Sequence, residues 1–273
     1  MTSQLDNKKT TLLKREASSA AMSIGIGLTH IRKFDFVQPG FFYSALSSFS
    51  FGLERILKLL VIWEYRVQNS GRFPTNKQLR DYGHNIHELM QFVKSGCEKR
   101  SLLMDDEVFQ DEIFHLIVPY LSEYALTARY YNLDTLTDRG HSTLEPFHRW
   151  DAEVGALICK RHYRLNLEKR ALIEQVSAKC EDAFSVMLQT ESGSPITSLR
   201  DFYLHGMTVA SKQRYSMYYL YVLVRLCSDF LAELDDELQE YPAISEFFVV
   251  FRNRDKQYIL QKKSWNPNPP YYF

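Results

Sequence analysis

The segment that most constrains the fold is a run of about forty residues near the end of the chain, from Ser198 to Leu238. Its apolar side chains recur at helical spacing, which predicts one long α-helix. The middle of this helix, Tyr215 to Leu226, is apolar on almost every side. Because such a helix must be surrounded by other protein, it lies at the centre of a core or in a subunit interface. The chain is therefore predicted to be all-α.

A second long helix is predicted between residues 41 and 67, where apolar side chains follow one another at steps of three or four. The segment Asn69-Ser70-Gly71 ends it. A shorter helix follows Gly83-His84-Asn85, and the Asn85 side chain is well suited to cap its first turn. We expect Gly96 to close this shorter helix.

The middle of the chain is expected to be mostly helical as well. Residues 105–131 predict a helix that is broken or kinked at Pro119, and 132–146 form the largest polar loop. A very long helix is then expected from about residue 147 to 188. The sequence Glu191-Ser192-Gly193-Ser194-Pro195 separates it from the last helix.

The two ends of the chain differ from this helical body. Residues 1–35 are polar and mixed, typical of an arm or a first irregular helix, and the apolar runs after Pro242 predict a small β-hairpin followed by an extended tail. We therefore expect an up-and-down bundle of long helices with an inserted helical and loop region and a small C-terminal β-hairpin. The expected parts are an N-terminal arm (1–35), a helical domain (36–240) with an insertion at about 97–147, and the hairpin and tail (241–273).

Composition limits the classes of partner. The 273 residues carry 33 basic and 33 acidic side chains, so the formal net charge is zero and any nucleic-acid contact must come from a local patch. The four cysteines are widely spaced, which favours reduced thiols over disulfides or a zinc site. The apolar piece near residues 22–28 is too short for a membrane span. We expect a soluble cytoplasmic protein that needs no metal or other cofactor.

The segment Arg200-Asp201-Phe202-Tyr203-Leu204-His205 points most directly to a function. A guanidinium can neutralise the charge of a phosphorane, and an imidazole can move a proton near neutral pH. Residues five apart on a regular helix, however, point roughly 140° apart at 3.6 residues per turn. Arg200 and His205 converge only if the helix begins inside the segment or if a two-fold partner completes the site.

A similar spacing recurs at Arg80 and His87, again with an acid, Asp81, directly after the arginine. This second set surrounds a predicted helix start, and we interpret it as incidental. His84 within the same region could still face a groove. Cys159 and His162 have a metal-compatible helical spacing, but no third ligand is evident, so no metal site is predicted.

The order of these features resembles the HEPN superfamily (higher eukaryotes and prokaryotes nucleotide-binding). The resemblance rests on the first long helix around Phe51 to Leu60, on Gly83 to Leu89, and on Arg200, Asp201 and His205 at the start of the last long helix. It covers roughly residues 41–95 and 150–238. The part of the insertion around residues 125–136 matches no family pattern.

The resemblance implies a metal-independent endoribonuclease that acts in defence or as a toxin and dimerises through its bundle. Its implied partners are RNA and a possible antitoxin or activator protein, with no membrane. His205 would act as general base or acid, Arg200 would stabilise the phosphorane, and Asp201 would orient one of them. The residues expected to contact RNA are Lys160, Arg161, Arg164, Tyr203 and Lys212.

Two alternatives remain open. The Arg200 segment can be an ordinary first turn, in which Asp201 caps the helix or offsets its dipole and Arg200 pairs with an acid. The basic run from Lys160 to Arg170 can be a solvated helix face. In that case the chain is a non-catalytic module that binds RNA or a nucleotide, or an oligomeric scaffold.

Overall fold

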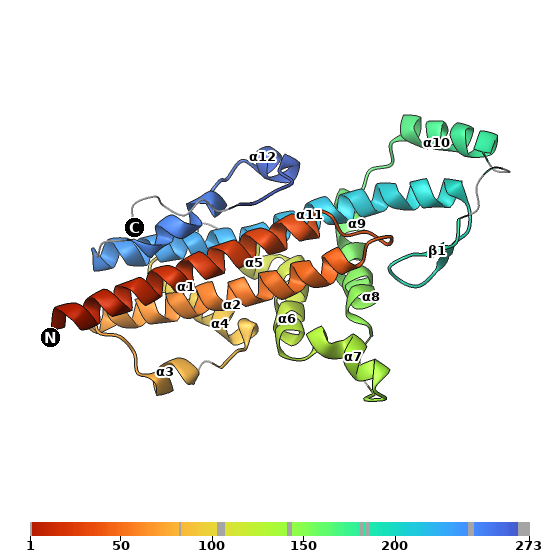
Figure 1. The fold of residues 1–273 in the computed structure, drawn as a ribbon. Coiled ribbons are helices and arrows are strands. Elements are labelled where there is room, and N and C mark those ends of the chain that lie inside the picture. The colour runs from red at the N-terminus through yellow and green to blue at the C-terminus, as the bar shows by residue number, and fades with distance from the viewer. Residues whose placement is uncertain are drawn as a thin grey trace.

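The computed structural model describes residues 2–81, 83–102, 107–140, 144–180, 183, 186–239 and 243–266. Three long helices form its body: α1 (Thr2–Ile31), α2 (Gly40–Gln68) and α11 (Leu199–Leu238). They lie side by side, and α2 runs back along α1 (Figure 1). The structure confirms the all-α fold class. Among the described residues, no helix combines the length and apolarity needed to cross a membrane.

Helix α11 is the long last helix expected from the sequence. It begins after Ser198, whose hydroxyl accepts a hydrogen bond from the backbone N–H of Asp201 at 3.0 Å. Every residue from Ser216 to Ser228 is buried, because α1, α2, α4 and the C-terminal segment pack around this half. The other half, toward Leu199, extends past the end of the body and carries α10 beside it (Figure 1).

The expectation of an N-terminal arm is wrong, because residues 2–31 form a regular helix that belongs to the core. Ala17, Ala20 and Ile24 are fully buried against α2. The crossing is close enough that a Cβ on Gly52 would lie 2.8 Å from the carbonyl oxygen of Ala20 and from the amide nitrogen of Ile24. Small side chains at the contact thus let the two helices approach backbone to backbone.

Helix α4 (Ile86–Lys99) and its cap agree with the sequence, but its end does not. The Asn85 side chain accepts hydrogen bonds from the N–H groups of His87 and Glu88 at 3.0 and 3.3 Å. Gly96 lies inside the helix, where a Cβ would meet the Phe230 ring at 2.4 Å. The glycine therefore permits close packing against α11 and does not terminate the helix.

The inserted region consists of short helices on one side of the body. After α3 (Asn76–Arg80) and α4, it contains α5 (Glu107–Gln110), α6 (Glu112–Leu126), the 3₁₀-helix η1 (Ala128–Tyr130) and α7 (Tyr131–Leu136). Pro119 lies within α6 and does not divide it. The side chain of Asp111 caps α6 by accepting from the Ile113 N–H at 2.9 Å.

The single long helix expected at residues 147–188 is wrong. The chain forms α8 (Pro146–Trp150), a π-helical turn η2 (Asp151–Gly155), α9 (Ala156–His162), an extended break, and then α10 (Leu167–Cys180). Asn166 begins α10, because its side chain accepts from the Lys169 N–H at 2.9 Å. Helix α10 packs on α11, and its Leu172 side chain is 60% exposed.

The small hairpin lies before α11 and not near the C-terminus. Strands β1 (Leu188–Gln189) and β2 (Pro195–Ile196) pair antiparallel, with Leu188 opposite Ile196. The expected C-terminal hairpin is instead the 3₁₀-helix η3 (Ile244–Phe251) and α12 (Lys256–Gln261), which cover α11. In η3, Phe247, Phe248 and Phe251 are buried while Val249 is exposed. That pattern is helical, whereas a strand would bury alternate residues. The expected tail at 267–270 falls outside the described residues.

Candidate functional site

The first two turns of α11 hold the residues that the sequence singled out. Arg200 reaches Glu174 on α10, with Nη2 3.2 Å from Oε1, and also Asp201, with Nη1 3.3 Å from Oδ1. All three side chains are substantially exposed. Arg200 therefore joins α10 to α11 through one surface ion pair, with Glu174, which solvent screens. This is the ordinary pairing that the sequence left open, although Ser198 and not Asp201 is the helix cap.

His205 faces a different neighbour, the turn between β1 and β2. Its Nε2 lies 2.6 Å from Oε2 of Glu191, whose side chain is fully buried, while the imidazole is 21% exposed. The Phe36 ring packs edge-on against the imidazole, with ring centroids 4.9 Å apart. When Nε2–H donates to Glu191, Nδ1 is the nitrogen left to exchange a proton. A buried carboxylate that orients a histidine in this way is typical of general acid–base sites.

Arg200 and His205 do not meet within one chain. Helix α11 begins at Leu199, before the segment, so both residues lie on regular helix and point about 140° apart. One contacts α10 and the other contacts the hairpin. Of the two ways in which these side chains could converge, only completion by a second chain remains.

Glu191 belongs to a network of buried charges. Lys212, only 7% exposed, pairs with Asp151 in the π-helical turn η2. Burial alone would raise the pKa of Glu191, but the hydrogen bond from His205 and the nearby charge of Lys212 hold it below its usual value. Glu191 is therefore ionised at neutral pH. Its Oε1 atom is buried and has no hydrogen-bond partner among the described residues. π-Helical turns are often found at functional sites.

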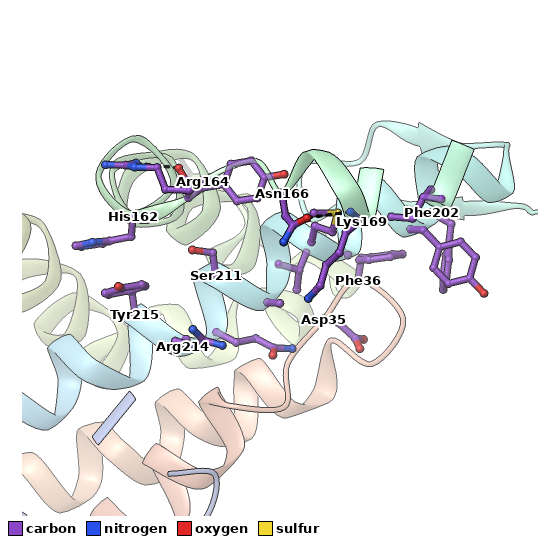
Figure 2. A pocket seen from close by; sticks show the side chains of 18 of the residues that line it. Asp35, Phe36, His162, Arg164, Asn166, Lys169, Phe202, Ser211, Arg214 and Tyr215 are labelled. Atoms are coloured by element: carbon purple, nitrogen blue, oxygen red, sulfur yellow. Dashed lines mark hydrogen bonds between the residues drawn. The ribbon is translucent and has the colours of Figure 1, made fainter. Parts of the chain in front are cut away.

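Next to this network lies a groove of about 610 Å³ between α10, α11, the break at residues 163–166 and the loop that joins α1 to α2. Figure 2 shows its walls, with Arg164, Asn166 and Lys169 on one side and Arg214 and Ser211 of α11 on the other. Within the described part of the chain, no ion pair involves Arg164, Lys169 or Arg214. One acid, Asp35, lines the groove, so its walls carry a net positive charge.

Aromatic rings line both ends of the groove. Phe36, Phe202 and Tyr203 lie at one end, and Tyr203 is 45% exposed. At the other end the ring of His162 lies flat on Tyr215, with centroids 3.7 Å apart and planes 4° apart (Figure 2).

His162 is electrically neutral at this end of the groove. Its Nε2 lies 2.6 Å from the hydroxyl of Tyr219. Burial and the charges of Lys256 and Arg161 lower the pKa of His162 to about 4. The ring therefore contributes an apolar stacking face at neutral pH and no charge.

The five residues expected to contact RNA divide between the groove and other places. Arg164 and Tyr203 line the groove. Lys160 is exposed on α9 outside it, and Arg161 pairs with Asp111 and Glu112 at 2.6 and 3.4 Å. The assignment of Lys212 as an RNA contact is wrong, because its ammonium group is buried with Asp151.

Several residues that shape the site were not identified from the sequence. Glu191 lies in a polar turn and has no pattern of its own that distinguishes it from a surface acid. The basic run that contains Lys169 is interpretable as a solvated helix face, Asp35 ends the expected arm, and Phe36 begins the helical domain without a predicted role. The Asn166 cap was the one local signal that could have revealed the break and hence the groove.

Neither a metal site nor a known relative identifies a further functional residue in the described part of the chain. The described residues contain no group of three or more His, Cys, Asp or Glu side chains able to hold a metal ion. Comparison of the chain with protein-family models, with curated proteins and with solved structures finds no match.

Proposed function

We propose that this chain binds single-stranded RNA in the groove between α10 and α11. The observation that carries the proposal is the combination of three cations without acidic partners and aromatic rings at both ends of one groove. Cations neutralise phosphates, and exposed rings stack on bases without regard to sequence. The zero net charge of the chain is compatible with this, because the positive charge is local.

The test measures RNA affinity as a function of salt. A labelled oligonucleotide is titrated with protein, and binding is followed by fluorescence anisotropy between 50 and 200 mM salt. With three phosphate contacts and a slope of about −0.7 per contact, the affinity should fall about 20-fold over this range. Lys169→Gln should weaken binding and reduce the slope by about 0.7. Lys160→Gln removes an exposed cation outside the groove and is the matched control.

The aromatic contribution is tested separately. Tyr203→Leu should weaken binding by about 1–3 kcal/mol without changing the salt slope, because a stacked base is lost and no phosphate contact. Equal effects of Lys169→Gln and Lys160→Gln, or no effect of Tyr203→Leu, would show that RNA does not occupy the groove.

A second candidate function is cleavage of the bound RNA without a metal, and the His205–Glu191 pair favours it. In this proposal His205 takes the proton of a ribose 2′-hydroxyl and the 2′-oxygen attacks phosphorus. The bond from phosphorus to the 5′-oxygen of the next nucleotide breaks, and that oxygen takes its proton from water. The products are a 2′,3′-cyclic phosphate and a 5′-hydroxyl. Arg200 of a second chain would neutralise the phosphorane. The resemblance to the HEPN superfamily, with its defence or toxin role, points the same way and stays a prediction.

Mixed dimers test the cleavage proposal sharply. Arg200→Ala and His205→Ala proteins should each be inactive in EDTA. If each site combines Arg200 of one chain with His205 of the other, mixing the two variants should restore about one quarter of the wild-type activity, because half of the dimers carry one intact site. RNA bound but left intact by the wild-type dimer would favour the binding function alone.

A further inference from the structure

A second cavity, of about 570 Å³, lies away from the groove and shares no residue with it. It is enclosed by α1, α2, α3, the turn before α4, the end of α6 and η1. In Figure 1, α3 and α6 lie below the long helices, whereas α10 and the hairpin lie at the right-hand end of the molecule. Binding of a ligand in this cavity is therefore separate from binding of RNA in the groove.

The floor of this cavity is apolar and partly open to solvent. Phe51 is 44% exposed and Leu126 is 48% exposed, although both lie beside a well-packed core. The rest of the apolar lining consists of Leu59, Ile62, Leu79 and Ala125. Apolar surface left uncovered within a concavity favours a ligand that carries an apolar body.

Most charges at the rim of the cavity neutralise one another. Arg55 pairs with Glu16. Glu54 accepts from Lys58 and lies against His84, in both cases through Oε1 at 2.7 Å. These contacts place two carboxylates inside the cavity with two matching cations. Because these cations are already paired, they offer little attraction to a ligand of high negative charge.

Arg129 is the exception at this rim. Its guanidinium lies over the Tyr130 ring, 4.8 Å from the centroid, and within the described part of the chain it forms no ion pair. Its side chain lines the cavity from η1. A planar guanidinium in this position matches a carboxylate, which it can hold through two parallel hydrogen bonds.

We propose that this cavity binds a small amphipathic monocarboxylate, with the carboxylate on Arg129 and the apolar body over Phe51 and Leu126. One unpaired cation balances one negative charge, and the apolar floor covers the body of the ligand. A phosphate monoester fits less well, because its second negative charge finds no further unpaired cation among the described lining residues.

The experiment is a calorimetric titration of the full chain with decanoate, kept below its aggregation concentration. Decanoate should bind at least tenfold more tightly than decanol and than decyl phosphate at pH 8. Arg129→Gln should weaken decanoate at least tenfold and leave the affinity for decanol unchanged. The matched control is Arg139→Gln, which removes an arginine that is 78% exposed outside the cavity and should have no effect.

A second variant tests the floor without removing a charge pair. Leu126→Glu adds a negative charge to a half-exposed position, so the fold should be kept while decanoate binding is lost. Circular dichroism of each variant verifies folding. Absence of decanoate binding to the folded wild-type chain, or equal affinity of the wild type and Arg129→Gln, would overturn the proposal. Decyl phosphate binding as tightly as decanoate would refute the selection for a single charge.

Discussion

Replacing Gly52 by alanine should destabilise the fold, because α1 and α2 touch backbone to backbone at this residue. An added Cβ would lie 2.7 Å from Cγ1 of Ile24 and 2.8 Å from both the Ile24 amide nitrogen and the Ala20 carbonyl oxygen. Favourable contacts of carbon need about 3.5–4.0 Å. Since two of the three opposing atoms are backbone, no side-chain rotation can relieve the overlap.

The expected size of this effect follows from two opposing contributions. Overpacking of this kind costs about 1–3 kcal/mol, because the two helices must separate along their length. Alanine regains about 1 kcal/mol of helix propensity over glycine. Because two of the opposing atoms are backbone, the upper part of that range applies, about 2–3 kcal/mol, so the net loss of unfolding free energy should be about 1–2 kcal/mol. For a chain of 273 residues that is a fall in Tm of roughly 2–4 °C.

Gly206→Ala is the matched control for this prediction. Gly206 also lies within a long helix, but nothing stands within 4 Å of the position a Cβ would take. The same change should therefore stabilise the protein by about 0.5–1 kcal/mol. Urea denaturation followed by circular dichroism measures both variants. If Gly52→Ala raised stability as much as Gly206→Ala, the close approach of α1 and α2 would be refuted.

Three further predictions concern buried or capping groups. The pKa of His162 is lowered from 6.5 to about 4 in the folded chain, so between these pH values the unfolded chain binds a proton that the folded chain does not. The free energy of unfolding should therefore fall as the pH drops from 6.5 to 4. Urea denaturation at several pH values should show a weaker pH dependence in His162→Gln. Asn85→Ala removes the cap of α4 and should cost about 1 kcal/mol, whereas an unchanged urea midpoint would disprove the cap. Lys212→Met leaves Asp151 without its cation and should cost about 3 kcal/mol. The double variant with Asp151→Asn should lose less than the sum of the two single losses, and strict additivity would rule out the pair.

The long central helices could be predicted because their signals are local and repeated. The centre of α11 is apolar on almost every side, and the structure buries every residue of it from Ser216 onward. The Asn85 cap uses atoms within three residues of one another. The break between α9 and α10 was missed because the apolar side chains keep their helical spacing across it. Asn166, which caps α10, is a single residue against that repeated pattern. The apolar run of η3 was ambiguous for a related reason, because a short apolar run fits a strand and a buried helix equally well.

The candidate site was harder to predict than the fold. The sequence left open whether Arg200 and His205 converge, because that depends on where the helix begins, and the structure turns them toward different neighbours. The partner of His205, Glu191, is fourteen residues away in a turn of unremarkable composition. Lys212 has the sequence character of a surface cation, yet it is buried, because Asp151 lies opposite it on η2. Such pairings are set by tertiary packing, and they leave no repeating pattern in the sequence.

Helix α11 has a buried half and a projecting half, and the two halves should differ in how readily they open to solvent. Amide hydrogens from Ser216 to Ser228 are enclosed by packed helices and should exchange with solvent only when the whole fold opens. The turns around Arg200 and His205 contact α10 and a hairpin whose two strands have two residues each, so local opening there leaves the body intact. A ligand held at this end would slow amide exchange nearby far more than at the centre of the helix. Local opening at the groove end is thus compatible with a stable body, which the other half of the same helix maintains.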